Sequence, residues 1–132
     1  MDNLLSGRVG VAHPLVVTNS GDNSINATAT ATAEQILHGV IKSTSALATS
    51  ITTPSVANII ASLGITPATY YDFVIDNSAG SNTVTLVLDA SITAPVGAVT
   101  GGNTLTVTTT NKIGVFRLYF VSATAAVIYR MA

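Results

Sequence analysis

The chain has 132 residues, of which 48% are hydrophobic and 8% are charged, whereas about 25% of the residues of a typical globular protein are charged. Five basic and six acidic residues give a formal net charge of -1, which excludes a basic surface for nucleic acid, and the absence of cysteine excludes disulfides, thiolate catalysis and cysteine-bound metals. The length suits one domain with a single core, and no apolar run approaches the roughly 20 residues of a membrane-spanning helix.

The N-terminal part of the chain is predicted to be an extended arm. Residues 1–29 are small, polar and rich in asparagine, and the apolar stretch around Val9 and Val11 is broken at Pro14. We expect this arm to reach a neighbouring protein subunit, with Val9 and Val11 at the contact. Residues 30–132 are predicted to form a single β-sandwich domain.

Two short strands are expected where this domain begins. Alternation of alanine and threonine over residues 27–33 predicts a strand with a flat alanine face. The apolar run 36–41 predicts a second strand, which is interrupted at Gly39.

One helix is predicted, over about residues 54–63. Thr53 is a suitable N-cap, and Pro54 suits the first helical position. The apolar residues that follow recur at helical spacing until Gly64, which ends the helix: Val56, Ile59, Ile60 and Leu63.

The second half of the chain is predicted to consist of successive strands. Residues 70–76 and 82–88 alternate between two faces on either side of a turn-forming cluster, which predicts a hairpin. Further strands are expected over residues 105–109, 113–121 and 125–131. The predicted fold is mainly β: an antiparallel β-sandwich or jelly-roll-like barrel with one short helix and an extended N-terminal arm.

The predicted strand within residues 114–121 has large apolar residues on both faces, and a two-layer fold would leave one of these faces in water. Since monomers rarely expose large apolar patches, we predict that this surface meets another copy of the chain. Arg117 and Arg130 lie on otherwise apolar strands, so each is expected to pair with a carboxylate or with backbone carbonyls. The residues expected in the core and at the oligomer interface are Phe116, Leu118, Tyr119 and Phe120.

No reaction chemistry is predicted. The two histidines, His13 and His38, are interpreted as structural or surface residues, because abundant serine and threonine single out no triad. Asp72 and Asp76 lie four residues apart on one strand face, which is typical of a solvated surface; with Asp89 they form an alternative Ca²⁺ site. We therefore expect a protein that is not an enzyme, with no cofactor, no metal, and no binding of nucleic acid or membrane.

The order of short motifs along the chain is similar to that of a known family. The motifs lie at residues 32–41, 52–60, 71–77, 82–86, 114–118 and 126–130. This succession resembles small β-rich virion proteins of tailed phages and some large DNA viruses, which are capsid decoration or fibre-type components. The resemblance implies a homotrimer on the capsid surface of a virion, bound to the major capsid protein or another shell protein. It carries no active-site residues.

Two other functions stay open. One is a self-polymerising extracellular filament or surface-layer subunit, in which the N-terminal arm donates a strand to the next copy. The other is a receptor- or glycan-binding fibre tip that uses Tyr70, Tyr71 and the glycine-rich loop 97–103.

Overall fold

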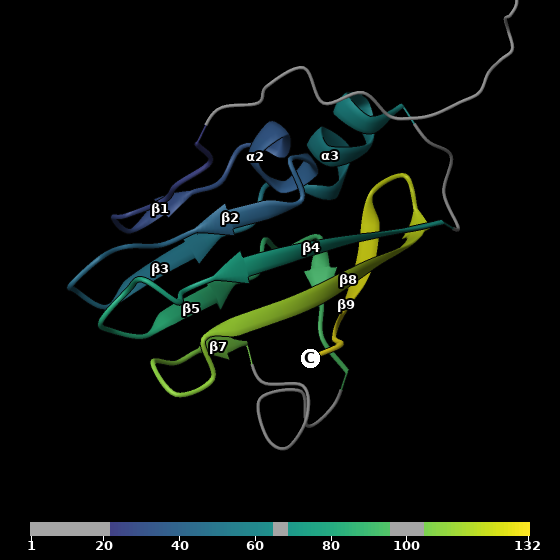
Figure 1. Cartoon of the computed structure of the whole chain (residues 1–132). Helices are drawn as coiled ribbons and strands as arrows, with labels where there is room; N and C mark the ends of the chain where they lie inside the picture. Colours follow the sequence, from purple (N-terminus) through teal and green to yellow (C-terminus); the bar gives the residue numbers. More distant parts are fainter. Residues whose placement is uncertain (1–21, 65–68, 96–104) are drawn as a thin grey trace, which may run out of the picture.

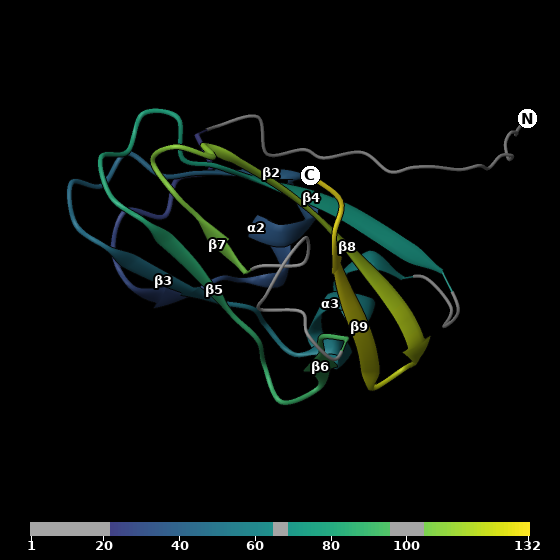
Figure 2. The same cartoon turned by 90° about the horizontal axis from the view of Figure 1, so that it is seen from below.

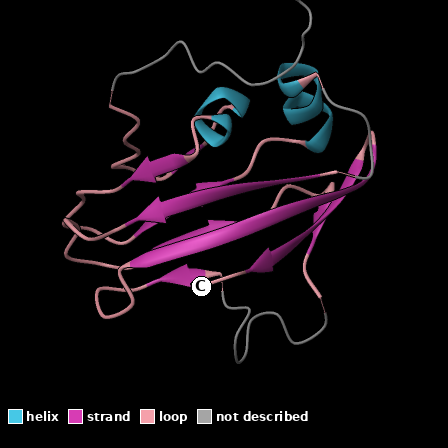
Figure 3. Ribbon diagram, turned by 45° about the vertical axis from the view of Figure 1, so that its right-hand side comes forward, coloured by secondary structure: helices cyan, strands magenta, loops and turns pink. Residues whose placement is uncertain are grey.

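The computed structural model describes residues 22–64, 69–95 and 105–132, and within them it confirms a mainly β fold (Figure 1). The elements are β1 (Ala29–Thr30), α2 (Ala33–Leu37), β2 (Val40–Lys42), β3 (Thr49–Thr52), α3 (Val56–Leu63), β4 (Tyr70–Asp76), β5 (Val84–Val87), β6 (Ile92–Thr93), β7 (Thr106–Val107), β8 (Ile113–Ser122) and β9 (Ala125–Arg130). The two helices lie next to each other on one side of the strands (Figure 3).

The strands form two mixed sheets, with the orders β1-β3-β5-β7 and β2-β4-β8-β9-β6. In Figure 2, β3 and β5 lie along one side of the molecule, and β4 and β8 lie along the other. From β1 to β8 the chain enters the two sheets in turn, so each strand meets its neighbour only after a passage through the other sheet. The chain returns in its original direction, and β1–β3, β3–β5 and β2–β4 are therefore parallel pairs.

This topology corrects the predicted antiparallel pairing. Both sheets combine parallel with antiparallel pairs, and the described strands form no closed barrel. The error has a simple cause, because side-chain alternation identifies a strand but does not reveal the direction of its neighbour.

The predicted hairpin is also wrong, although both of its strands exist. β4 belongs to the five-stranded sheet and β5 belongs to the four-stranded sheet. The turn-forming cluster between them therefore carries the chain from one sheet to the other. The strands predicted over residues 105–109, 113–121 and 125–131 are confirmed as β7, β8 and β9, of which β7 is shorter than expected.

Asn77 fixes the crossing between β4 and β5. Its fully buried side-chain amide donates to the carbonyls of Asn82 (2.7 Å) and Val107 (3.1 Å), and its backbone N–H donates to the carbonyl of Lys112 (2.8 Å). The side-chain oxygen of Asn77 lies against Gly80, where a Cβ atom would be only 2.1 Å away. Asn77 thus joins the end of β4 to β7 and to the residues that precede β5 and β8.

The run 36–41 is a helix followed by a strand, and not the single strand that was predicted. Thr32 accepts a hydrogen bond from the Gln35 N–H (3.1 Å), and the Gln35 side chain accepts one from the Thr32 N–H (2.9 Å). This capping box starts α2. Gly39, with a φ of 97°, then turns the chain into β2.

The predicted helix at 54–63 is confirmed as α3, with a different cap. Ser55 is the N-cap and accepts a hydrogen bond from the Asn58 N–H (3.2 Å). The hydroxyl of Thr53 instead accepts a hydrogen bond from the Asp89 N–H (2.9 Å), which ties β3 to the end of β5. Gly64 ends the helix in the left-handed conformation, as predicted.

Part of the segment that was predicted as an arm is packed into the domain. Ile25 belongs to the core, with 6% of its surface exposed. The side-chain amide of Asn23 donates to the carbonyls of Gln35 (2.9 Å) and Val40 (2.8 Å). The folded domain therefore includes residues 23–29, and of the predicted alanine–threonine strand only Ala29 and Thr30 are in β1.

One core joins the inner faces of both sheets and the helices. The rings of Phe73 and Phe116 stack at its centre, with centroids 5.6 Å apart. Its largest fully buried side chains are Phe73, Phe116, Phe120, Ile36, Ile41, Ile51, Ile59, Ile75, Leu86, Leu118, Ile128 and Val56.

We predict that Asn77→Ala destabilises the domain by about 2 to 4 kcal/mol, because it leaves the buried carbonyls of Asn82 and Val107 without their donor. Urea unfolding followed by circular dichroism at one fixed protein concentration measures the change. Asn58→Ala, at an exposed position of α3, is the control and should shift the midpoint little. Equal midpoints for the two variants would contradict the role of Asn77.

Candidate functional site

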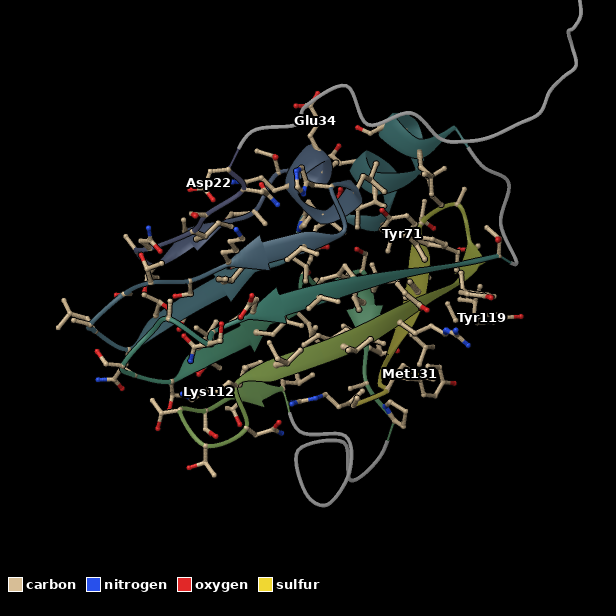
Figure 4. All side chains as sticks on the ribbon, viewed as in Figure 1. Asp22, Glu34, Tyr71, Lys112, Tyr119 and Met131 are labelled. Carbon is tan, nitrogen blue, oxygen red and sulfur yellow. The ribbon has the colours of Figure 1, made fainter. Side chains whose placement is uncertain are left out.

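The outward side of the five-stranded sheet exposes several large hydrophobic side chains, and we call it the tyrosine face. Along β8 the inward side chains are fully buried and the alternate ones point outward. In Figure 4, Tyr119 projects outward from β8. Of the nine exposed large hydrophobic side chains in the described residues, seven lie on the outward positions of β2, β4, β8 and β9 or directly after β9. These seven define the tyrosine face: Val40, Tyr70, Ile113, Tyr119, Val121, Tyr129 and Met131.

An ion pair lies in the middle of the tyrosine face. Asp72 on β4 is directly opposite Arg117 on β8, and the two side chains form two parallel hydrogen bonds of 2.8 and 3.0 Å. The guanidinium also lies over the ring of Tyr70, 3.9 Å from its centroid. The hydrogen bonds that Arg117 donates to Asp72 raise the pKa of Arg117. The charges of Asp72 and Arg117, which are opposite each other on β4 and β8, thus neutralise each other. The prediction that Arg117 pairs with a carboxylate is confirmed.

Arg130 lies on the opposite side of the same sheet. Arg130 on β9 lies directly opposite Phe116 on β8, and its guanidinium is 5.1 Å from the centre of the Phe116 ring. It donates to the carbonyls of Thr106 (2.8 Å), Ile113 (3.4 Å) and Ala132. Burial lowers its pKa. The prediction that Arg130 binds backbone carbonyls is therefore confirmed, and its charge is kept away from the tyrosine face.

The outward side of the four-stranded sheet has the opposite character, and we call it the hydroxyl face. Its strands alternate in the same way, but threonine and serine occupy the outward positions. Val87, 40% exposed, is the only large apolar side chain among the described outward positions of this sheet. The hydroxyl face consists of Thr30, Ser50, Thr52, Thr85, Val87 and Thr106.

The structure separates the residues that were predicted for the oligomer interface. Phe116, Leu118 and Phe120 are 0% exposed inside a single chain, so they belong to its core and present no surface to a partner. Tyr119 is 41% exposed and lies on the tyrosine face. Val9 and Val11 lie outside the described residues.

Sequence reasoning missed most of the tyrosine face. Tyr70, Tyr129 and Met131 belong to it, and each continues the alternation between inward and outward positions of β4 or β9. That alternation was visible in the sequence. What was not visible is that β4, β8 and β9 are neighbours in one sheet, which places these side chains side by side.

Tyr70 and Tyr71 do not form the common surface that a glycan-binding tip would need. Tyr70 points outward, whereas Tyr71 is half-buried on the helix side of β4, where Figure 4 labels it. The Tyr71 hydroxyl donates to the carbonyl of Leu37 (2.6 Å), and burial raises its pKa. The loop 97–103 lies outside the described residues.

The candidate metal ligands are also held apart. Asp72 is bound to Arg117, whereas Asp89 accepts hydrogen bonds from the N–H (2.9 Å) and hydroxyl (2.5 Å) of Ser91. These hydrogen bonds lower the pKa of Asp89. In the part of the chain that the structure describes, no three histidine, aspartate or glutamate residues form a group that could hold a metal ion. His13 lies outside that part.

A wide groove of mixed polar and apolar lining lies beside the two helices. It has a volume of about 720 Å³ and runs between the start of α2, the start of α3 and the end of β3. Its polar lining residues are hydroxyl, amide and carboxylate side chains: Thr30, Thr32, Glu34, Thr52, Thr53, Ser55, Asn58, Ser62 and Asp89. The two carboxylates of the lining are Glu34 and Asp89, and the lining contains neither a histidine nor an aromatic ring.

Comparisons with protein-family models, with curated proteins and with solved structures found no match to this chain. Among the described residues, no helix is long and apolar enough to cross a membrane. A functional assignment therefore rests on the residues themselves and on the contrast between the two outward faces.

Asp76 lies at the border of the tyrosine face and supplies a pH-dependent contribution to stability. Hydrogen bonds from the side chain and the backbone N–H of Ser78, together with the attraction of Lys42, hold the pKa of Asp76 below its ordinary value. A lowered pKa in the folded state stabilises the fold above the unfolded pKa. The contribution is lost as the pH falls through the folded pKa.

We predict that Asp76→Asn reduces the loss of stability on acidification from about pH 6 to about pH 3, because the substituted side chain does not titrate. Ser78→Ala should reduce it in part, since it removes one of the two hydrogen bonds to Asp76. Urea midpoints at the two pH values measure the effect. Ser81→Ala in the same turn is the control, and it should behave like the wild type. The prediction fails if all variants lose stability equally.

Proposed function

We propose that this chain is a non-enzymatic structural protein of a virion: a capsid decoration, cement or spike subunit that assembles as a homotrimer on the capsid surface. The observation that carries the proposal is the contrast between the tyrosine face and the hydroxyl face. A protein that is bound on one side and hydrated on the other needs two such faces. The partners would be further copies of the chain and the major capsid protein or another shell protein.

The distribution of charge supports the same function. Burial of an unpaired charge in an interface costs roughly several kcal/mol. Only 8% of the residues of this chain are charged, so few charges would have to be buried. The central charges of the tyrosine face are already paired with each other. Association through this face would therefore leave neither of these two charges buried without its partner. No nucleic acid, membrane, cofactor or metal has a part in the proposal.

We also propose that the two sheets are the layers of a β-sandwich. Both send their inward side chains into one core, which supports this arrangement. The parallel pairs favour a sandwich of two mixed sheets over a jelly roll, because the jelly roll is built from antiparallel strands.

The alternative is an extracellular filament or surface-layer subunit that exchanges strands. Strand exchange needs an open sheet edge that is long enough to pair with a donated strand. The edge strands of the described sheets have two or three residues each: β1, β7, β2 and β6. The β2 edge is moreover covered by hydrogen bonds with residues 23–25. These short edges favour association through a face.

The molar mass of the purified chain in solution tests the proposal. We expect light scattering after size exclusion to give three times 13.4 kDa at two protein concentrations. The same stoichiometry is expected after removal of residues 1–21, a truncation that spares Asn23 and Ile25 in the folded domain. Polymers of variable length that disappear with the truncation would favour the filament. A monomer under all conditions would contradict both assemblies.

A further inference from the structure

We infer that the tyrosine face is the contact between copies of this chain. This inference rests on the proposed function and adds to it the surface and the partner, which is a second copy. The alternative occupants are a foreign shell protein and water, and they become outcomes of the test below.

The charge pattern of the face makes it complementary to itself. Its central row contains one carboxylate and one guanidinium, Asp72 and Arg117, which bind each other through two hydrogen bonds. Lys42 and Asp76 form a second pair of opposite charges, opposite each other at the border. A face with balanced and paired charges can meet its own copy without repulsion between like charges, whereas it offers no net charge to attract a strongly charged partner.

The side chains of the face are those that stabilise protein interfaces. Tyrosine and arginine are enriched at binding hot spots, since they bury a large area and keep a polar group for hydrogen bonding. Tyr129 on β9 lies directly opposite Arg117, and Tyr70 and Tyr119 lie opposite each other two residues further along β4 and β8. A phenol hydroxyl both donates and accepts hydrogen bonds, so these tyrosines can pair with their equivalents in another copy.

The face is also ordered before any partner binds. Arg117 is held by Asp72 on one side and by the ring of Tyr70 on the other. A side chain that is fixed in this way loses little conformational freedom on association. The regular strands β4, β8 and β9 hold the rest of the face in register.

Such a face can be buried in two symmetric ways. Two copies can pack this face against itself about a two-fold axis, or three copies can turn it toward a common three-fold axis, so that one part of the face meets a different part of the face of the next copy. The second arrangement is the one that fits the proposed trimer. In either case the hydroxyl face remains in water.

Two charged substitutions with equal exposure test the inference. Tyr119 on the tyrosine face is 41% exposed and Val87 on the hydroxyl face is 40% exposed, so an aspartate at either position stays hydrated in the single chain. We expect Tyr119→Asp to reduce the mass measured by light scattering to that of a single chain, 13.4 kDa. Val87→Asp should keep the mass of the wild type. Circular dichroism shows that both variants are folded.

A second measurement does not depend on breaking the assembly. The chain has no cysteine, so Val121→Cys on the tyrosine face and Val87→Cys on the hydroxyl face each supply one unique thiol. We expect a maleimide to modify the thiol at position 121 at least about ten-fold more slowly than the thiol at position 87 in the assembled protein. In urea the two rates should become equal.

The outcomes separate this inference from the proposed function. If both aspartate variants keep the wild-type mass and both thiols react rapidly, the copies meet elsewhere and the inference is wrong, while the homotrimer stands. A wild-type dimer that Tyr119→Asp dissociates supports the contact and contradicts the trimer. A wild-type monomer contradicts the contact between copies, and a shell protein or water then covers the face.

Discussion

The buried side chain of Asn77 is the interaction on which the two-sheet arrangement depends. It stands where the chain leaves β4 for β5, and its amide and backbone N–H donate to β7 and to the residues that precede β5 and β8. Each element from β1 to β8 repeats this change of sheet. The pairs β1–β3, β2–β4 and β3–β5 are parallel after this change, whereas β5–β7 and β4–β8 are antiparallel, and β8 lies between β4 and β9.

The character of the surface follows from β8. Its ten residues alternate between Phe116, Leu118 and Phe120 on the inside and a second apolar set outside. A single core between the two sheets requires only the inward apolar side chains. Because the outward positions of the four-stranded sheet carry hydroxyl groups instead, the two sides of the domain differ in polarity although they share one core. The proposed association of copies through the tyrosine face is a use of that difference.

The sequence was a good guide to elements and a poor guide to their neighbours. Side-chain alternation located β4, β5, β8 and β9, and helical spacing located α3. The signal for α2 was also present, as Thr32 and Gln35 at capping-box spacing, but an apolar run as short as 36–41 fits a strand equally well. The crossing at Asn77 could not be foreseen, because a turn within one sheet and a turn between two sheets use the same residue types. The tyrosine face could not be predicted either, because its prediction requires knowing which strands are neighbours in the sheet.

The alternation between sheets also determines how the chain must fold. Val40 pairs with Val74 and Phe73 pairs with Phe116, so most strand pairs join residues that are far apart in the sequence. Within the described sheets, only β8 and β9 are both paired and consecutive. Folding that depends on distant contacts is slow, because the entropy of closing long loops is lost before the contacts form. β8 and β9 form the local strand pair of the described sheets, whereas β4 can pair with β8 only after a long loop has closed.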